Sequence, residues 1–185
     1  MSEEKKIIDR FDGEYRFLSN FYQYPFEYRG LVYPNAEAAF QAQKCSNDEG
    51  RIKYTLVKNP VAAKRMGRKE PDLPQDWDQI SYGIMKEILT AKFAVDSVKP
   101  LEEPREMTMK LWNTGDAELI EGNHWHDNLW GACSCERCRN REDKNRLGKI
   151  LMEIRDMIDT KMLECASGEM MYFWEKENED EKSGR

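Results

Sequence analysis

The sequence predicts a single compact α+β domain that is mainly helical and contains short strands. Its 185 residues are enough to bury one hydrophobic core but too few for two full domains. With 39% hydrophobic and 35% charged residues, the composition is that of a soluble globular protein, which excludes global disorder. Short aromatic and β-branched runs alternate with helical patterns, without regular βαβ units or a glycine-rich phosphate loop, and this mixture favours the α+β class.

The two ends of the chain are predicted to lie outside this domain, which we expect to span residues 10–168. Residues 1–9 are interpreted as an N-terminal extension. Residues 169–185 hold six acidic and three basic side chains, which predicts a mobile tail in which the run MMYFW at 170–174 docks as a last strand or turn. The first residues lack the apolar run of a signal peptide, and no stretch is apolar enough to span a membrane, so we expect a cytoplasmic protein without a membrane partner.

Two elements of the first half have clear local signals. The segment 26–33 alternates around Arg29-Gly30 and predicts a short hairpin, which leads into a helix with Asn35 as its N-cap. In the segment 59–67, an N-cap asparagine, a proline at the first helical position and a terminal glycine predict a helix of about two turns.

The second half is predicted to add three helices and a strand. Apolar spacing indicates a core-facing helix from 76 to about 95, with Ile80, Ile84 and Ile88 on its buried side. The other elements are a helix from 104 to about 112, a brief strand over 117–121, and a helix from 144 to about 162.

The first candidate site is an acid inside a small and apolar helical start, YPNAEAAFQAQK at 33–44. Glu37, Phe40, Gln41 and Lys44 recur at three- and four-residue spacing, so one helix face offers an acid, an amide and an amine. The simpler interpretation is that Glu37 complements the helix dipole in the first turn.

The second candidate site is HWHDNLWGAC at 124–133, followed by Asn145. Here Asp127 precedes Trp130 and Gly131, and a tryptophan beside an acid and a glycine is typical of a base-stacking platform. The same pattern also occurs in ordinary core turns.

A cysteine cluster follows directly, as Cys133, Cys135 and Cys138 in CSCERC. With His124 or His126 as a fourth ligand, these thiols are candidates for a structural zinc that would clamp the loop carrying Asp127. The alternative is a reduced loop with incidental cysteines. Five cysteines, an odd number, do not suggest a disulfide framework, and no cofactor is expected to be required for catalysis.

Several separated motifs together resemble the NADAR family, also called the YbiA-like family, in order and spacing across residues 10–158. They are FLSNFY at 17–22, YPNAEAAFQAQK at 33–44, NPVAAKRMGR at 59–68, DWDQISYGIMKEILTAKF at 76–93, and DNLWGA with NRLGKILMEIR at 127–155. The resemblance implies a single α+β domain that hydrolyses N-glycosidic bonds. The implied substrates are ADP-ribose attached to guanine in nucleic acid or, for some members, phosphorylated intermediates of riboflavin synthesis.

Carried over by position, the resemblance implies catalytic roles for Glu37, Asp127 and Lys44. The residue after the acid is Ala38, where many members have an aromatic residue or histidine. Ribose and phosphate contacts are implied for polar or backbone positions, and base stacking for two tryptophans. The implied binding residues are Phe17, Ser19, Asn20, Gly67, Arg68, Trp77, Trp130, Gly131 and Asn145.

The chemistry of these residue types is suited to breaking a ribose C1–N bond. One carboxylate can stabilise the positive charge at C1 or activate water, while the second protonates the leaving base. Lys44 offers another route through a transient imine, for which its pKa must be lowered. The sequence leaves both routes open.

The net charge of −6 argues against a protein that coats nucleic acid and favours a small ligand or a locally engaged nucleotide. The expected partner is ADP-ribosylated guanine in DNA or a small ribosyl nucleotide, and no obligate protein partner is expected. Riboflavin-pathway intermediates are the alternative substrates. A module that binds ADP-ribose without cutting it is the alternative function, which Ala38 and the cysteine-bearing loop favour.

Overall fold

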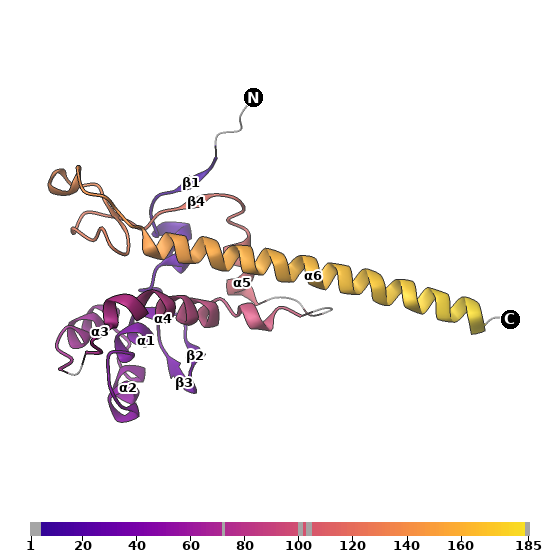
Figure 1. Cartoon of the computed structure of the whole chain (residues 1–185), viewed down its shortest axis with the longest axis horizontal. Helices are drawn as coiled ribbons and strands as arrows, with labels where there is room; N and C mark the ends of the chain where they lie inside the picture. The colour runs from indigo at the N-terminus through magenta and orange to yellow at the C-terminus, as the bar shows by residue number, and fades with distance from the viewer. Residues whose placement is uncertain (1–4, 72, 100–101, 103–104, 184–185) are drawn as a thin grey trace.

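A computed structural model describes residues 5–71, 73–99, 102 and 105–183, with side-chain surroundings up to residue 168. It confirms the α+β prediction, because helices dominate the described part of the chain and the strands form three two-stranded sheets (Figure 1). The elements are β1 (Ile7–Ile8), the 3-10 helix η1 (Gly13–Leu18), β2 (Phe26–Tyr28), β3 (Leu31–Tyr33), α1 (Ala36–Ala42), α2 (Asp48–Thr55), α3 (Pro60–Gly67), α4 (Trp77–Lys92), η2 (Val95–Ser97), α5 (Glu106–Trp112), β4 (Glu118–Leu119), β5 (Gly122–Asn123), β6 (Ala132–Cys133), η3 (Glu136–Cys138) and α6 (Arg146–Ser183).

The predicted hairpin and helix cap are both present. β2 and β3 pair antiparallel, and Arg29 and Gly30 between them have φ of 50° and 76°, the two positive values that a type I′ turn requires. Asn35 then accepts the backbone N–H of Ala38 on its Oδ1 at 2.9 Å and donates its Nδ2 to the carbonyl of Lys58 at 3.0 Å. These two hydrogen bonds fix the start of α1 relative to the chain that enters α3.

Helix α1 lies at the centre of the first half of the molecule, and all seven of its residues are buried. It contacts α2, α3 and α4, which enclose it from different sides. The sequence carries only a weak signal for α2, because that helix is weakly amphipathic and buries only Tyr54. Its position nevertheless matters, since α2 helps to bury α1, which carries Glu37 and Gln41, in the interior.

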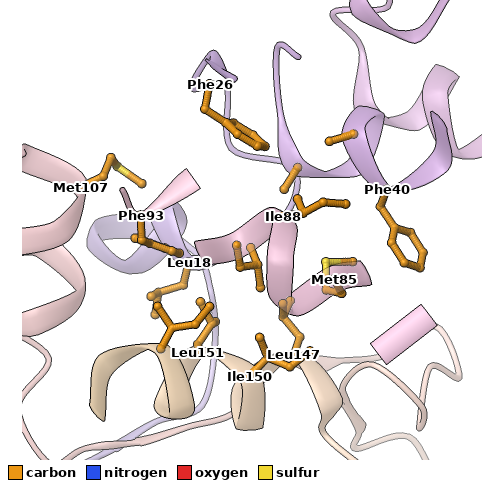
Figure 2. Packing of buried hydrophobic residues seen from close by; sticks show 14 of the residues in the cluster. Leu18, Phe26, Phe40, Met85, Ile88, Phe93, Met107, Leu147, Ile150 and Leu151 are labelled. Carbon is orange, nitrogen blue, oxygen red and sulfur yellow. The ribbon is translucent and has the colours of Figure 1, made fainter. Parts of the chain in front are cut away.

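Helices α4 and α6 form the main packing layer and lie against each other (Figure 1). In Figure 2, Met85 and Ile88 of α4 lie between Phe40 of α1 and Leu147 and Ile150 of α6. The helix is as predicted, but its buried stripe is rotated by about one residue, since Ile80 and Ile84 are only partly buried. The fully buried positions are Ser81, Met85, Ile88, Leu89 and Lys92.

The end of the segment 1–9, which was predicted to be an N-terminal extension, pairs with the domain. β1 pairs in parallel with β4, with Ile7 opposite Glu118 and Ile8 opposite Leu119, and Ile8 is only 3% exposed. Residues 7–8 therefore belong to the domain. Their short length and the distance to β4 along the chain hide this pairing from a local pattern.

The last helix is also longer than predicted. α6 continues to Ser183 and extends past the other elements, whereas the apolar stripe indicated an end near residue 162 and a strand or turn at 170–174 (Figure 1). The residues after 162 include strong helix formers such as Glu, Lys and Met. Their helix propensity favours a longer helix than the apolar pattern predicts. The predicted docking and mobility of 169–185 concern side chains that lie outside the described part of the chain.

Among the helices that the structure describes, we find none with both the length and the apolar character needed to cross a bilayer.

Candidate active site

A cavity of about 1020 Å³ opens between α1, α3, the segment before β2 and the segment that follows β4. It is at the large end of the range that is usual for ligand sites. Nine of the residues predicted as site residues line it together: Ser19, Asn20, Glu37, Lys44, Arg68, Trp77, His126, Asp127 and Trp130. Helix packing thus brings the two candidate sites of the sequence into one cavity.

Glu37 lies on the inner wall of the cavity and is 5% exposed. Its Oε1 accepts Nε2 of Gln41 at 2.8 Å, and its backbone N–H donates to the carbonyl of Asn20 at 3.0 Å. Burial raises the pKa of the Glu37 carboxyl, while Lys64 and other nearby groups oppose that rise. A carboxyl that only complements a helix dipole needs no such enclosure, so the local environment favours a chemical use.

Lys44, which lies in the turn after α1, lines the same cavity. Its Nζ lies 3.4 Å from the carbonyl oxygen of Gly67 and 5.4 Å from the centroid of the Trp77 ring. Burial lowers the pKa of Lys44, and Arg68 lowers it further, against the opposing charge of Glu37. The pKa of Lys44 is thus shifted in the direction that a nucleophilic amine requires.

The third wall carries Asp127 and Trp130. Asp127 accepts the backbone N–H groups of Leu129 at 3.1 Å and Trp130 at 2.9 Å on its Oδ1. The Trp130 ring meets Phe40 edge-on, with centroids 5.3 Å apart and planes at 76°. Asp127 therefore holds the turn that carries Trp130, a positioning task that the sequence did not indicate.

Glu121 is an acid of the cavity that the sequence analysis did not single out. Burial raises its pKa to about 7, and the charge of Asp127 contributes in the same direction, while Lys64 opposes it. Its Oε2 is buried and has no hydrogen-bond partner among the described residues. The signal that was available is an acid at the end of a short strand followed by glycine, which is weak without the tertiary structure.

Four predicted binding residues lie outside the cavity lining: Phe17, Gly67, Gly131 and Asn145. Asn145, with φ of 39°, accepts the N–H of Glu121 on Oδ1 at 3.1 Å and donates Nδ2 to the carbonyl of Leu119 at 2.8 Å. A side chain on Gly131 would overlap the carbonyl oxygen of Glu121. Both residues therefore lie close to Glu121 and outside the cavity lining.

Phe17 is buried against Phe93, edge-on with centroids 6.5 Å apart. Its carbonyl and that of Ser19 accept Nζ of Lys92, at 2.7 Å and 2.9 Å. Lys92 is 1% exposed, and burial lowers its pKa to about 7. The predicted scaffold helix thus ends in a buried lysine that fixes the segment 17–20 at the cavity, a role that the helical pattern did not reveal.

Gly67 is the last residue of α3, as the sequence predicts, and it has no positive φ. Its requirement is steric, since a Cβ at this position would overlap the Oε1 of Gln41 and crowd its Cβ at 2.9 Å. The absence of a side chain lets α3 approach α1 and leaves Gln41 beside Glu37.

Replacing Gly67 with Ala is expected to destabilise the protein by about 1–3 kcal/mol, because α3 must move away from α1. Gly83→Ala is the matched control: this helical position is exposed and its added Cβ meets no atom within 4 Å. Urea unfolding of both variants tests the prediction, with the control expected to be more stable than wild type by up to about 1 kcal/mol. Equal stabilisation of both variants would contradict the close approach.

One wall of the cavity is basic although the whole chain is acidic. Lys64, Arg65 and Arg68 all come from α3 or its C-cap and all line the cavity, with Arg10 joining from the N-terminal segment. Lys69, the residue after Arg68, is not among the lining residues. Guanidinium groups gathered at a cavity are suited to phosphate.

The predicted metal ligands also come together. One donor atom each from His126, Cys133, Cys135 and Cys138 lie within 4.8 Å of one another, next to the loop of Asp127. His124 instead lies 3.1 Å, through its Nδ1, from the hydroxyl of Ser134.

Comparison with known proteins places this site in a family context. The model of the NADAR domain matches residues 8–159. The chain is 33% identical to "N-glycosidase YbiA" of Shigella sonnei over 146 residues, which cover 78% of this chain and 82% of that protein. It is 30% identical over 148 residues to an N-glycosidase of Nostoc punctiforme, covering 78% and 86%. The NMR structure of Escherichia coli YbiA superimposes with a TM-score of 0.71 at 30% identity, covering 87% of this chain and 89% of that one.

Proposed function

Because this chain belongs to the NADAR domain family, we propose that it is an N-glycosidase that removes ADP-ribose from ADP-ribosylated guanine in DNA or nucleotides. The observation that carries this proposal is that buried Glu37 and Lys44 line the same cavity, beside a basic wall. The curated relatives are named N-glycosidases, which supports the general reaction. The substrate is our inference from the charges of the cavity.

The basic wall supports a substrate with phosphate groups. Lys64, Arg65 and Arg68 together offer three cationic groups to one side of the cavity, which is suited to the diphosphate of ADP-ribose. Trp77 and Trp130 flank Phe40 from two sides, with centroids at 5.1 Å and 5.3 Å, and give the cavity an aromatic surface for a base. The net charge of −6 favours local engagement of one modified nucleotide over coating of a duplex.

In the proposed reaction, the bond between ribose C1 and the guanine nitrogen breaks while C1 gains positive charge. Glu37 stabilises this charge, and Glu121 gives its proton to the leaving base. The neutral amine of Lys44 bonds to C1 and loses one proton to Glu37. The bond between C1 and the ring oxygen then breaks, the ring oxygen takes the second proton of the amine, and C1 and the nitrogen are left joined as an imine. One water then hydrolyses the imine, which releases ADP-ribose and restores Lys44.

The role of Asp127 changes in this proposal. Its Oδ1 already accepts two backbone N–H groups of its own turn, and its charge raises the pKa of Glu121. We therefore give the proton-donor role to Glu121, because its raised pKa keeps it protonated near neutral pH. Asp127 has the role of raising that pKa.

The pH profile tests Glu121. Its carboxyl has a pKa raised to about 7, so it holds its proton below that pH and loses it above. We expect kcat/KM to fall as the pH rises through about 7, and Glu121→Gln to remove this descending limb while lowering the rate by about 10²-fold. The measurement is kcat/KM against pH for both proteins, and a limb that persists in the variant would count against the role.

The raised pKa of the Glu121 carboxyl also makes the stability of the folded protein depend on pH. Between about pH 4.5 and 7 the folded protein holds a proton on Glu121 that the unfolded chain has released, so its contribution to stability falls as the pH rises through this window.

The substrate is tested by incubation of the purified protein with DNA carrying ADP-ribosylated guanine and, separately, with phosphorylated riboflavin-pathway intermediates. Mass spectrometry then follows the products. Release of ADP-ribose supports the proposal, whereas ribose 5-phosphate from the intermediates alone would replace the substrate by the alternative. Tight binding of ADP-ribose without any product would favour the alternative that the protein binds ADP-ribose without cutting it.

A further inference from the structure

We propose that His126, Cys133, Cys135 and Cys138 bind a structural Zn²⁺ ion at the rim of the cavity. Their four donor atoms lie within 4.8 Å of one another. Nδ1 of His126 lies 3.2 Å from Sγ of Cys135 and 3.5 Å from Sγ of Cys138. The site is separate from the proposed chemistry at Glu37 and Lys44, and nothing in the comparisons assigns a metal to it.

The distances fit a tetrahedral ion. With Zn–S bonds of about 2.3 Å and Zn–N bonds of about 2.05 Å, tetrahedral angles place sulfur about 3.6 Å from nitrogen and about 3.8 Å from another sulfur. The two distances to Nδ1 of His126 differ from this by a few tenths of an ångström. A set of three thiolates and one imidazole is a zinc ligand set, and its softness disfavours Mg²⁺ and Ca²⁺.

The local backbone is shaped to bring these donors together. The N–H of Cys138 donates to the carbonyl of Cys135 at 2.9 Å, which closes the tight turn of a C-x-x-C ligand pair. Asn123 of β5 pairs with Cys133 of β6, so the first thiol is attached to the segment that leads to the histidine. His126 has φ of 69°, a costly conformation for a residue other than glycine, at the point where its ring meets the thiols.

A disulfide explains this cluster less well. A disulfide among three thiols would leave one thiol unpaired. It would also give no reason for the position of His126 beside two sulfur atoms. Cys138 is 2% exposed although it lies in a loop segment with many charged residues, which is unusual for a thiol without a partner. Zn²⁺ with three thiolates and a neutral imidazole carries one negative charge, and Arg137, Arg139 and Arg141 in the same loop offset it.

The site is connected to the cavity wall by short hydrogen bonds. The N–H of Cys133 donates to Oδ1 of Asn128 at 3.1 Å, and the N–H of Ser134 donates to the carbonyl of Asn123 at 3.0 Å. Asn123 also accepts the N–H of Asp127 and donates to its carbonyl, at 3.2 Å and 2.8 Å. The metal would therefore fix the loop of Asp127, a consequence that rests on the proposed function, whereas the metal site itself does not.

Metal analysis of the full chain tests the site without any activity measurement. We expect about one zinc per chain in protein purified under reducing conditions, and loss of that zinc from Cys135→Ser and Cys138→Ser. Cys165→Ser is the matched control, because this thiol belongs to α6 and is not part of the cluster, and it should keep its zinc. Less than about a tenth of an equivalent in wild type, even after incubation with zinc, or full zinc in Cys138→Ser, would overturn the proposal.

A second measurement remains informative if the serine variants fail to fold. Replacement of zinc by Co²⁺ in wild type should give intense thiolate-to-metal charge-transfer bands and the visible bands of a tetrahedral site. Alkylation should spare three cysteines until a chelator is added. Rapid alkylation of all exposed thiols without a chelator, or a disulfide detected by mass spectrometry of the unreduced protein, would overturn the zinc site.

Discussion

Glu37→Gln is expected to lower kcat by at least about 10³-fold while the fold and the affinity for ADP-ribose are largely retained. The amide keeps an oxygen that can accept the Nε2 of Gln41, the bond that Glu37 makes at 2.8 Å. It cannot stabilise positive charge at C1 or accept a proton. Because burial already penalises the ionised form of Glu37, loss of the charge should not reduce the free energy of unfolding.

Three measurements on this variant separate catalysis from structure. They are product release by mass spectrometry, ADP-ribose binding by calorimetry, and urea unfolding. Glu49→Gln is the matched control, an acid-to-amide change on exposed α2, where the carboxylate is 88% exposed and only 4.0 Å from Lys53. Full activity of Glu37→Gln would remove the central residue of the proposed function, and equal losses in both variants would show a nonspecific effect.

Lys44→Met is expected to lower kcat by about 10²-fold or more, and reduction with borohydride should trap a covalent adduct on the wild-type protein but not on this variant. An imine between Lys44 and C1 forms with loss of water, so its reduced form is heavier than the protein by ADP-ribose minus one oxygen atom. Burial and the adjacent Arg68 lower the pKa of Lys44, which leaves more of the amine neutral than at an exposed lysine.

Intact-protein mass spectrometry during turnover, followed by peptide mapping, tests this prediction. Lys53→Met on exposed α2 is the control and should form the adduct at the wild-type level, since that side chain is 65% exposed. An active Lys44→Met variant would exclude the amine as a nucleophile. Loss of activity without any trapped adduct would transfer the attack to a water activated by Glu37, with Lys44 then acting as a charge near C1.

The binding-module alternative is now weaker on structural grounds. Ala38, which differs from many relatives, is fully buried in the core and has no place at the cavity surface. The cysteine-bearing loop does not remove the acids, because Asp127 and Glu121 both remain at the cavity. The two features that favoured binding without turnover therefore do not disable the proposed machinery.

The sequence by itself determined the elements whose signals lie within a few residues. The Arg29-Gly30 turn, the Asn35 cap and the start of α3 at Pro60 all depend on backbone preferences of neighbouring residues. The same holds for Glu37 and Gln41, because helical spacing alone puts them on one face of α1. Lys44 instead lies in the turn that follows this helix. The separated motifs also determined the family.

Only the tertiary structure decided which charged groups are buried and what they face. Glu121 and Lys92 look like ordinary polar residues in the sequence, and their pKa values shift because distant elements exclude water from them. Asn145 and Gly131 match binding motifs, yet they support the backbone and side chain of Glu121. Desolvation and close approach depend on residues far away along the chain, so local spacing carries no signal for them.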